Sequence, residues 1–80
     1  MKVVSDKTIE RFGQYKRLLM QENSKGRENI FSHEIAVLAQ VTAAQVRRDL
    51  MEFKLSGSPN KGYSVTELVS KLNDTLGEIP

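Results

Sequence analysis

The sequence predicts a mainly α-helical domain with a small β wing, and three observations support this prediction. Four stretches place apolar residues at helical spacing behind a residue that can cap a helix. The second and third stretches are separated by only a short turn, as in two helices that pack together. The loop between the third and fourth stretches is rich in turn-forming residues and can form a hairpin. The four capping residues are Ser5, Ser32, Thr42 and Ser64.

The length and composition indicate one small domain, which we expect to span residues 1–80. Apolar side chains make up 39% of the chain, and twelve basic against ten acidic residues give a net charge of +2. This charge is compatible with a polyanionic partner but is too mild to indicate one alone. The chain has no cysteine, which excludes a disulfide, a thiol nucleophile and a thiolate metal site. With no apolar run near the roughly 18 residues of a membrane span and no apolar signal core, we expect a cytoplasmic protein.

The first helix should begin after Ser5 and run to about Glu22. We interpret Gly13, which interrupts this helix, as a position of close packing against a neighbouring element. Gly26 stands where it can end the helix. The apolar stripe that faces the core contains Ile9, Phe12, Tyr15, Leu18 and Leu19, with the tyrosine expected at the edge of the core.

The second helix should be short and should follow a brief strand at Ile30–Phe31. Ser32 is its predicted N-cap. Its core-facing residues should be Ile35, Leu38 and Ala39, which recur at helical spacing. Only Gln40 and Val41 then separate this helix from the third one. Two helices joined by so few residues form a helix-turn-helix unit, in which the second helix enters the major groove of DNA.

The third helix, about residues 42–53, has a well-specified start and one apolar side. Thr42 and Gln45 have the T-x-x-Q spacing of a capping box, in which each side chain bonds the backbone N–H of the other residue. Val46, Leu50 and Phe53 recur at i, i+4 and i+7 and should face the core. Gln45 therefore has two possible roles, since its amide either caps Thr42 or projects outward to an adenine.

The opposite face of this helix has the chemistry of a DNA contact. Ala44 and Arg48 lie at its centre and are flanked by Gln45 and Arg47. Arginine pairs bidentately with guanine, glutamine pairs with adenine, and alanine can contact a thymine methyl group. The alternative is a solvated helix face with no partner. We expect Asp49, nearer the core side, to pair with a basic side chain.

The loop and the last helix complete the predicted fold, a winged helix-turn-helix. The loop, residues 54–63, is called the wing below. Lys54 and Lys61 can either contact DNA phosphates or be solvated. Ser64 and Glu67 have the S-x-x-E spacing of a capping box at the start of the last helix. The core-facing residues of that helix should be Val65, Leu68, Val69, Leu72 and Leu76, with Gly77 at its end.

The stretch Val41–Leu50, with Gly62–Tyr63 and the closing helix after it, resembles the N-terminal winged-helix domain of the Rex family of redox-sensing transcriptional repressors. The resemblance spans roughly Ser5 to Gly77. It implies binding to AT-rich palindromic operators as a dimer, and sensing of NADH and NAD through a Rossmann domain that follows in that family. The chain contains no G-x-G-x-x-G, so this cofactor function cannot be assigned to any residue here. The chain is either an excised DNA-binding domain or a free-standing relative.

The wing departs from the family pattern, which resembles F-G-E-F-G-K-R-G-V-G-Y. Gly57, Gly62 and Tyr63 of the pattern are kept here, whereas Ser58 and Pro59 replace its adjacent basic pair, and Lys54 and Lys61 restore positive charge nearby. The operator sequence of the family is therefore not carried over to this chain. The residues predicted to contact DNA are Thr42, Ala43, Ala44, Gln45, Arg47, Arg48, Lys54, Asn60, Lys61 and Gly62.

The alternative function is a winged-helix protein–protein interaction module. In that interpretation, the apolar outer face of the last helix or the Leu55 side of the wing meets a partner protein. We predict no enzyme activity, no metal site and no bound cofactor. The single histidine, His33, has no second histidine or cysteine with which to complete a metal site and is expected at the surface.

Overall fold

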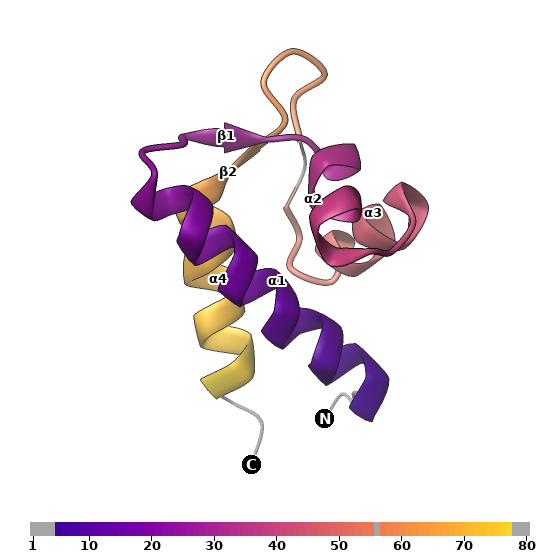
Figure 1. The fold of residues 1–80 in the computed structure, drawn as a ribbon. Helices are drawn as coiled ribbons and strands as arrows, with labels where there is room; N and C mark the ends of the chain where they lie inside the picture. The colour runs from indigo at the N-terminus through magenta and orange to yellow at the C-terminus, as the bar shows by residue number, and fades with distance from the viewer. Residues whose placement is uncertain (1–4, 56, 78–80) are drawn as a thin grey trace.

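The computed structural model describes residues 5–55 and 57–77 as a helical domain with a two-stranded antiparallel sheet (Figure 1). α1 packs along α4, and α2 packs against α3. The wing projects beyond the two strands at the end of the molecule opposite the start of α1. This arrangement confirms the predicted winged helix-turn-helix. The elements are α1 (Asp6–Ser24), β1 (Asn29–Ile30), α2 (Ser32–Ala39), α3 (Ala43–Met51), β2 (Tyr63–Ser64) and α4 (Val65–Gly77).

Three of the four predicted caps are confirmed. In each of them, the side-chain oxygen accepts a hydrogen bond from the backbone N–H three residues further on. The donor–acceptor distances are 3.2 Å at Ser5, 3.0 Å at Thr42 and 3.3 Å at Ser64. These bonds satisfy N–H groups that have no partner inside the helix, and so they fix where α1, α3 and α4 begin.

The predicted cap of α2 is wrong by one residue. Phe31 is the N-cap, and Ser32 is the first helical residue. The Phe31 carbonyl accepts from the backbone N–H of Ile35 at 3.1 Å, and the Glu34 carboxylate accepts from the Phe31 N–H at 3.0 Å. Because Glu34 supplies the side-chain acceptor, this helix start does not need the hydroxyl group of Ser32.

The core contains the apolar stripes predicted for α1, α3 and α4, with two differences. Tyr15 is fully buried rather than at the core edge. Leu38 is 49% exposed, because the short α2 turns Ile35, Ala36 and Ala39 toward the core instead. The buried apolar residues are Phe12, Tyr15, Leu19, Ile30, Ile35, Ala36, Ala39, Val46, Leu50, Phe53, Val65, Leu68 and Leu72.

Of the two glycines considered for the first helix, Gly26 has its predicted role and Gly13 does not. Gly26, with φ of +85°, comes directly after the capping residue of α1 and ends the helix as predicted. Gly13 is not a site of close packing, since an added Cβ would meet no atom nearer than the Arg17 guanidinium at 3.8 Å. The helix therefore has room for a larger residue at this position.

The sheet joins segments that are far apart in the sequence. Asn29 pairs with Ser64, and Ile30 pairs with Tyr63. Among wing residues 54–55 and 57–63, the predicted hairpin is a single pair, Ser58 with Gly62, joined by N–H···O bonds of 2.8 and 2.7 Å. The arm that follows this pair continues as β2 and bonds to β1, so the sheet holds the wing above α2 (Figure 1).

An ion-pair cluster joins the end of α1 to the start of α2 and was not predicted. The Arg27 guanidinium contacts Glu22 at 3.1 Å and also pairs with Glu34, while Lys25 contacts Glu22 at 3.0 Å. Hydrogen bonds from Lys25 and Arg27 lower the pKa of Glu22, which is buried at the end of α1. The cluster closes the loop that leads into β1.

Candidate nucleic-acid interface

The outer face of α3 exposes the residues that were predicted to meet DNA. Ala44, Arg47 and Arg48 are exposed, whereas Val46 and Leu50, on the other side of the same helix, are fully buried. A methyl group beside two guanidinium groups gives a surface that can approach another molecule closely and donate forked hydrogen bonds. The first two turns of α3 present this surface directly after the Thr42 cap.

Arg47 connects the α3 face to the wing. Its side chain lines a cavity of about 230 Å3 with Ser32, at the start of α2, and with Ser58, Pro59 and Gly62 of the wing. Arg47 therefore lies where α3 faces the wing. The helix face and the wing form one surface, and the cationic side chain of Arg47 lies at their junction.

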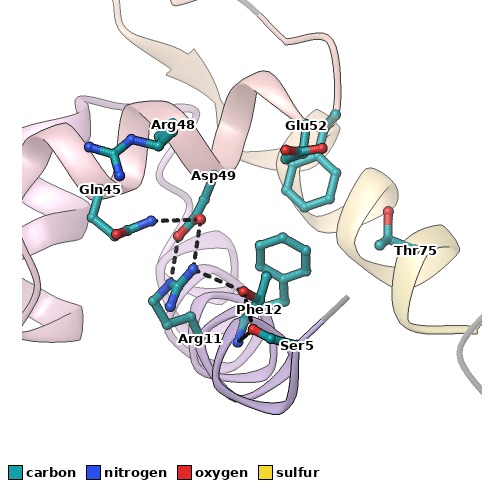
Figure 2. Close-up of a pocket in the computed structure, with 10 residues that line it drawn as sticks. Ser5, Arg11, Phe12, Gln45, Arg48, Asp49, Glu52 and Thr75 are labelled. Carbon is teal, nitrogen blue, oxygen red and sulfur yellow. Dashed lines mark hydrogen bonds and ion pairs between the residues drawn. The ribbon is translucent and has the colours of Figure 1, made fainter. Parts of the chain in front are cut away.

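Asp49, the acidic residue of α3, is buried and forms an ion pair with Arg11 of α1. This confirms the prediction that Asp49 pairs with a basic side chain. Figure 2 shows its carboxylate between Arg11 and Gln45. The Arg11 Nε and Nη2 atoms donate to Oδ2 and Oδ1 at 2.8 and 3.0 Å, and the Tyr15 hydroxyl donates to Oδ2 at 2.6 Å. The carboxylate is therefore tied to α1 and does not add a bare negative charge to the outer face.

The pKa shifts of Asp49, Tyr15 and Arg11 keep the ion pair between Asp49 and Arg11 charged. Burial alone would raise the pKa of Asp49, but the hydrogen bonds from Arg11 and Tyr15 outweigh burial and hold the pKa below its ordinary value. Burial and the bond to Asp49 raise the pKa of Tyr15, so its hydroxyl group remains a donor. The Asp49 bond also raises the pKa of Arg11.

The Gln45 side chain does not cap Thr42, and its contact with an adenine stays a prediction. Its backbone N–H donates to Thr42, but its side-chain Nε2 donates to Asp49 Oδ1 at 2.9 Å, four residues along the helix. The second half of the predicted capping box is therefore wrong. Sequence reasoning missed this bond, although the Gln–Asp spacing of four is a known helical pair and could have indicated it.

The other predicted residues divide between the surface and the scaffold. Lys54, Asn60 and Lys61 are exposed. Ala43 is half-buried and packs against the core. Gly62, with φ of +75°, would place a Cβ atom 2.4 Å from the carbonyl oxygen of Ile30, so only glycine fits there. Whether any of these ten residues touches DNA stays a prediction.

A larger cavity of about 400 Å3 lies beside Arg48, between the first turns of α1, the later half of α3 and the end of α4 (Figure 2). Phe12 and Phe53, with ring centroids 5.0 Å apart, line it. In residues 5–55 and 57–77, no three His, Cys, Asp or Glu side chains are placed to hold a metal ion. None of the helices described is long and apolar enough to cross a lipid bilayer.

The apolar surface expected for a protein partner is not where the alternative function requires it. The apolar side chains of α4 are buried or half-buried against the core, and Leu55 also packs against the core. Among the residues described, the large apolar side chains that are exposed lie elsewhere, on α1, α2 and α3. They are Met20, Val37, Leu38 and Met51.

Comparisons with known proteins match this chain over most of its length. Residues 3–50 match the family model described as putative DNA-binding protein N-terminus. The redox-sensing transcriptional repressor Rex of Roseiflexus sp. (strain RS-1) is 38% identical over 72 residues, which cover 90% of this chain and 33% of the repressor. Rex of Syntrophomonas wolfei subsp. wolfei is 40% identical over 74 residues, which cover 92% of this chain and 35% of that repressor. The chain spans about a third of the length of these curated relatives.

Solved structures show the same fold. A crystal structure of RSP, a Rex-family repressor, superposes with a TM-score of 0.82 at 35% identity and covers 96% of this chain and 35% of that chain. The crystal structure of RSP in complex with beta-NAD+ and operator DNA superposes with a TM-score of 0.84 at the same identity and covers 96% of this chain and 36% of that chain. A third structure, of RSP with beta-NADH, superposes with a TM-score of 0.80.

Proposed function

The chain belongs to the family of putative DNA-binding protein N-termini, as the N-terminal DNA-binding domain of the Rex type, and from this premise we propose that it binds double-stranded DNA through α3 and the wing. One observation supports the proposal most strongly. Arg47 and Arg48 are exposed on a face of α3 that is continuous with the wing, while the acidic side chain of that helix, Asp49, is buried and paired. The first two turns of α3 therefore offer DNA a basic surface, and the exposed Glu52 lies beyond the end of that helix.

We propose different tasks for the two arginines. Arg48 lies at the centre of the exposed face, beside Ala44, so we assign it to base edges in the major groove. Arg47 lies against the wing, so we assign it to a phosphate where the backbone passes between helix and wing. Lys54 and Lys61, which are exposed at the two ends of the wing, would add phosphate contacts.

Tight binding requires two copies of this domain. A single module of this size buries about 600 to 1,000 Å2 on DNA, so we expect one copy to bind weakly. Two copies on a palindrome would each read one half-site. We extend the AT-rich palindromic operator of the resembled family to this chain as part of the proposal. We assign no nicotinamide cofactor to residues 1–80, because they contain no G-x-G-x-x-G turn.

Fluorescence anisotropy tests the proposal. The 80-residue chain is titrated into a labelled AT-rich palindromic duplex and a scrambled duplex over a salt series. We expect the logarithm of the affinity to fall linearly with the logarithm of salt concentration, with a slope of about 0.9 per phosphate contact. Arg48→Ala should remove the preference for the palindrome, whereas Arg47→Ala should weaken binding to both duplexes about equally.

Arg17→Ala is the matched control, because Arg17 is an exposed arginine on α1 and lies outside the proposed interface. It should bind both duplexes as the wild type does. Absence of binding to either duplex at low salt would contradict the proposal. In that case the exposed Val37 and Leu38 of α2 would become the surface to test for a protein partner.

A further inference from the structure

Asp49 determines which end of the Gln45 amide faces outward. An ionised carboxylate can only accept hydrogen bonds, so the group that contacts it must be the amide nitrogen of Gln45 and not its oxygen. The opposite orientation would bring the amide oxygen against Asp49 Oδ1, and two acceptors would face each other. Chemistry as well as geometry therefore fixes the orientation of this side chain.

Asp49 itself has little freedom to move. Arg11 holds both of its oxygens, and Tyr15 donates to Oδ2 from the core. Its side chain is 6% exposed, so water cannot readily replace these donors. The acceptor that orients the Gln45 amide is therefore fixed in place by α1, and it is present before any DNA arrives.

The carbonyl oxygen of Gln45 is left available. Across residues 5–55 and 57–77, no group donates a hydrogen bond to this Oε1 atom. None of the side-chain oxygens described is both buried and without a partner, so Oε1 is open to solvent. Gln45 lies in the first turn of α3, three residues before Arg48, so the two side chains are neighbours on the surface of the helix (Figure 2).

We infer that Gln45 reads DNA as a hydrogen-bond acceptor whose orientation is set by Asp49, and that it selects a base carrying an amino group in the major groove. Adenine N6 and cytosine N4 are the donors there, whereas guanine and thymine present acceptors at the same edge. Gln45 would therefore favour adenine or cytosine on the strand it faces. This inference rests on the proposed function and adds a specificity-determining residue to it.

The first step of the test uses the wild-type chain and a pool of duplexes with randomised sequence. Rounds of selection should enrich a common site. Each adenine of that site is then replaced, one at a time, by deoxynebularine, which has hydrogen in place of the amino group, and each cytosine is replaced by the analogue that lacks its N4 amino group. Affinity for each duplex is measured with wild type, Gln45→Ala and Gln45→Met.

At one position per half-site, loss of the amino group should weaken wild-type binding about three- to tenfold. The same replacement should change the affinity of Gln45→Ala and Gln45→Met less than twofold, because these variants have no acceptor. Gln45→Met keeps the length of the side chain, which separates loss of the acceptor from loss of packing. Gln21→Met is the matched control, since Gln21 is exposed on α1, and it should respond as the wild type does.

The possible failures are distinguishable. A pool that yields no common site would overturn both the proposed function and this inference. A common site at which wild type and Gln45→Met respond equally to loss of every amino group would overturn the inference and leave DNA binding in place. A position that requires guanine or thymine opposite Gln45 would overturn it as well, because the outward group would then be a donor.

Discussion

Replacing Asp49 by asparagine should destabilise the fold strongly while changing only one atom. In the wild type, Oδ2 accepts from Arg11 Nε and Tyr15, and Oδ1 accepts from Arg11 Nη2 and Gln45. An asparagine side chain replaces one of these two oxygens with an NH2 group. In either orientation, the new NH2 group takes the place of an oxygen that accepted two of the four hydrogen bonds, and an Arg11 N–H then faces it donor to donor.

The size of the effect follows from these bonds. Hydrogen bonds to charged groups contribute about 1.5 to 3 kcal/mol each. The Arg11 side chain is 23% exposed, so water can partly replace its lost partner. We therefore take the lower end for both bonds and expect Asp49→Asn to lower the free energy of unfolding by about 3 kcal/mol. Such a loss is large for a small domain, whose total stability is about 5 to 15 kcal/mol.

Urea unfolding followed by circular dichroism measures this change. Asp74→Asn is the matched control, because Asp74 is exposed on α4, and it should stay within about 0.5 kcal/mol of the wild type. An Asp49→Asn variant as stable as that control would refute the reasoning. It would mean that the cluster of Asp49, Arg11 and Tyr15 does not stabilise the packing of α3 on α1.

The pH dependence gives a second readout for the same pair of proteins. The pKa of Asp49 in the folded chain lies below its ordinary value of 3.8, so its ionised form is favoured by folding. The stability from this group is fully present above that value and is lost as pH falls through the lower folded pKa. The difference between wild type and Asp49→Asn should be constant near neutral pH and should shrink below pH 3.8. A difference that grows on acidification would contradict the assignment.

Three further predictions concern backbone positions. Thermal and urea unfolding measure the changes in stability, and the salt series of the DNA titration measures the change in binding. Gly13→Ala should raise the free energy of unfolding by about 0.5 to 1 kcal/mol, because the added methyl group meets nothing nearer than 3.8 Å; a lower melting temperature would show that the helix needs glycine there. Gly62→Ala should lower the free energy of unfolding by more than about 2 kcal/mol, because its Cβ would clash with the carbonyl of Ile30. Gly26→Ala, which has positive φ but open space around it, should lower it by only about 1 kcal/mol. Equal losses in the two variants would rule out the clash. Lys54 has φ of +57°, so Lys54→Gly should raise stability by about 0.5 kcal/mol and reduce the salt slope of DNA binding by about 0.9; an unchanged slope would remove this lysine from the interface.

The local features of this fold could be predicted from the sequence because they depend on near neighbours. A cap bonds three residues along the chain, and an apolar stripe repeats every turn, so the starts of α1, α3 and α4 follow from Ser5, Thr42 and Ser64. Gly26 likewise ends α1 through its own backbone angle. The face of α3 that carries Arg47 and Arg48 follows from the same periodicity, once the other side of that helix is buried.

The features that could not be predicted depend on contacts between distant segments. Asp49 and Arg11 are 38 residues apart, and nothing in the spacing of either shows that α1 brings them together. The partner of Asp49 determines in turn where the Gln45 amide points. Leu38 has the helical spacing of a core residue, but the packing of an eight-residue helix selects a different side.

An NMR titration tests the central claim most directly. The 15N-labelled chain is titrated with the AT-rich palindromic duplex, and the backbone amide shifts are followed residue by residue. The account predicts that the largest changes lie in residues 43–48 at the start of α3 and in residues 57–62 of the wing, with α4 unaffected. Changes concentrated on α4, or on the exposed Val37 and Leu38 of α2, would contradict it and place the binding surface elsewhere.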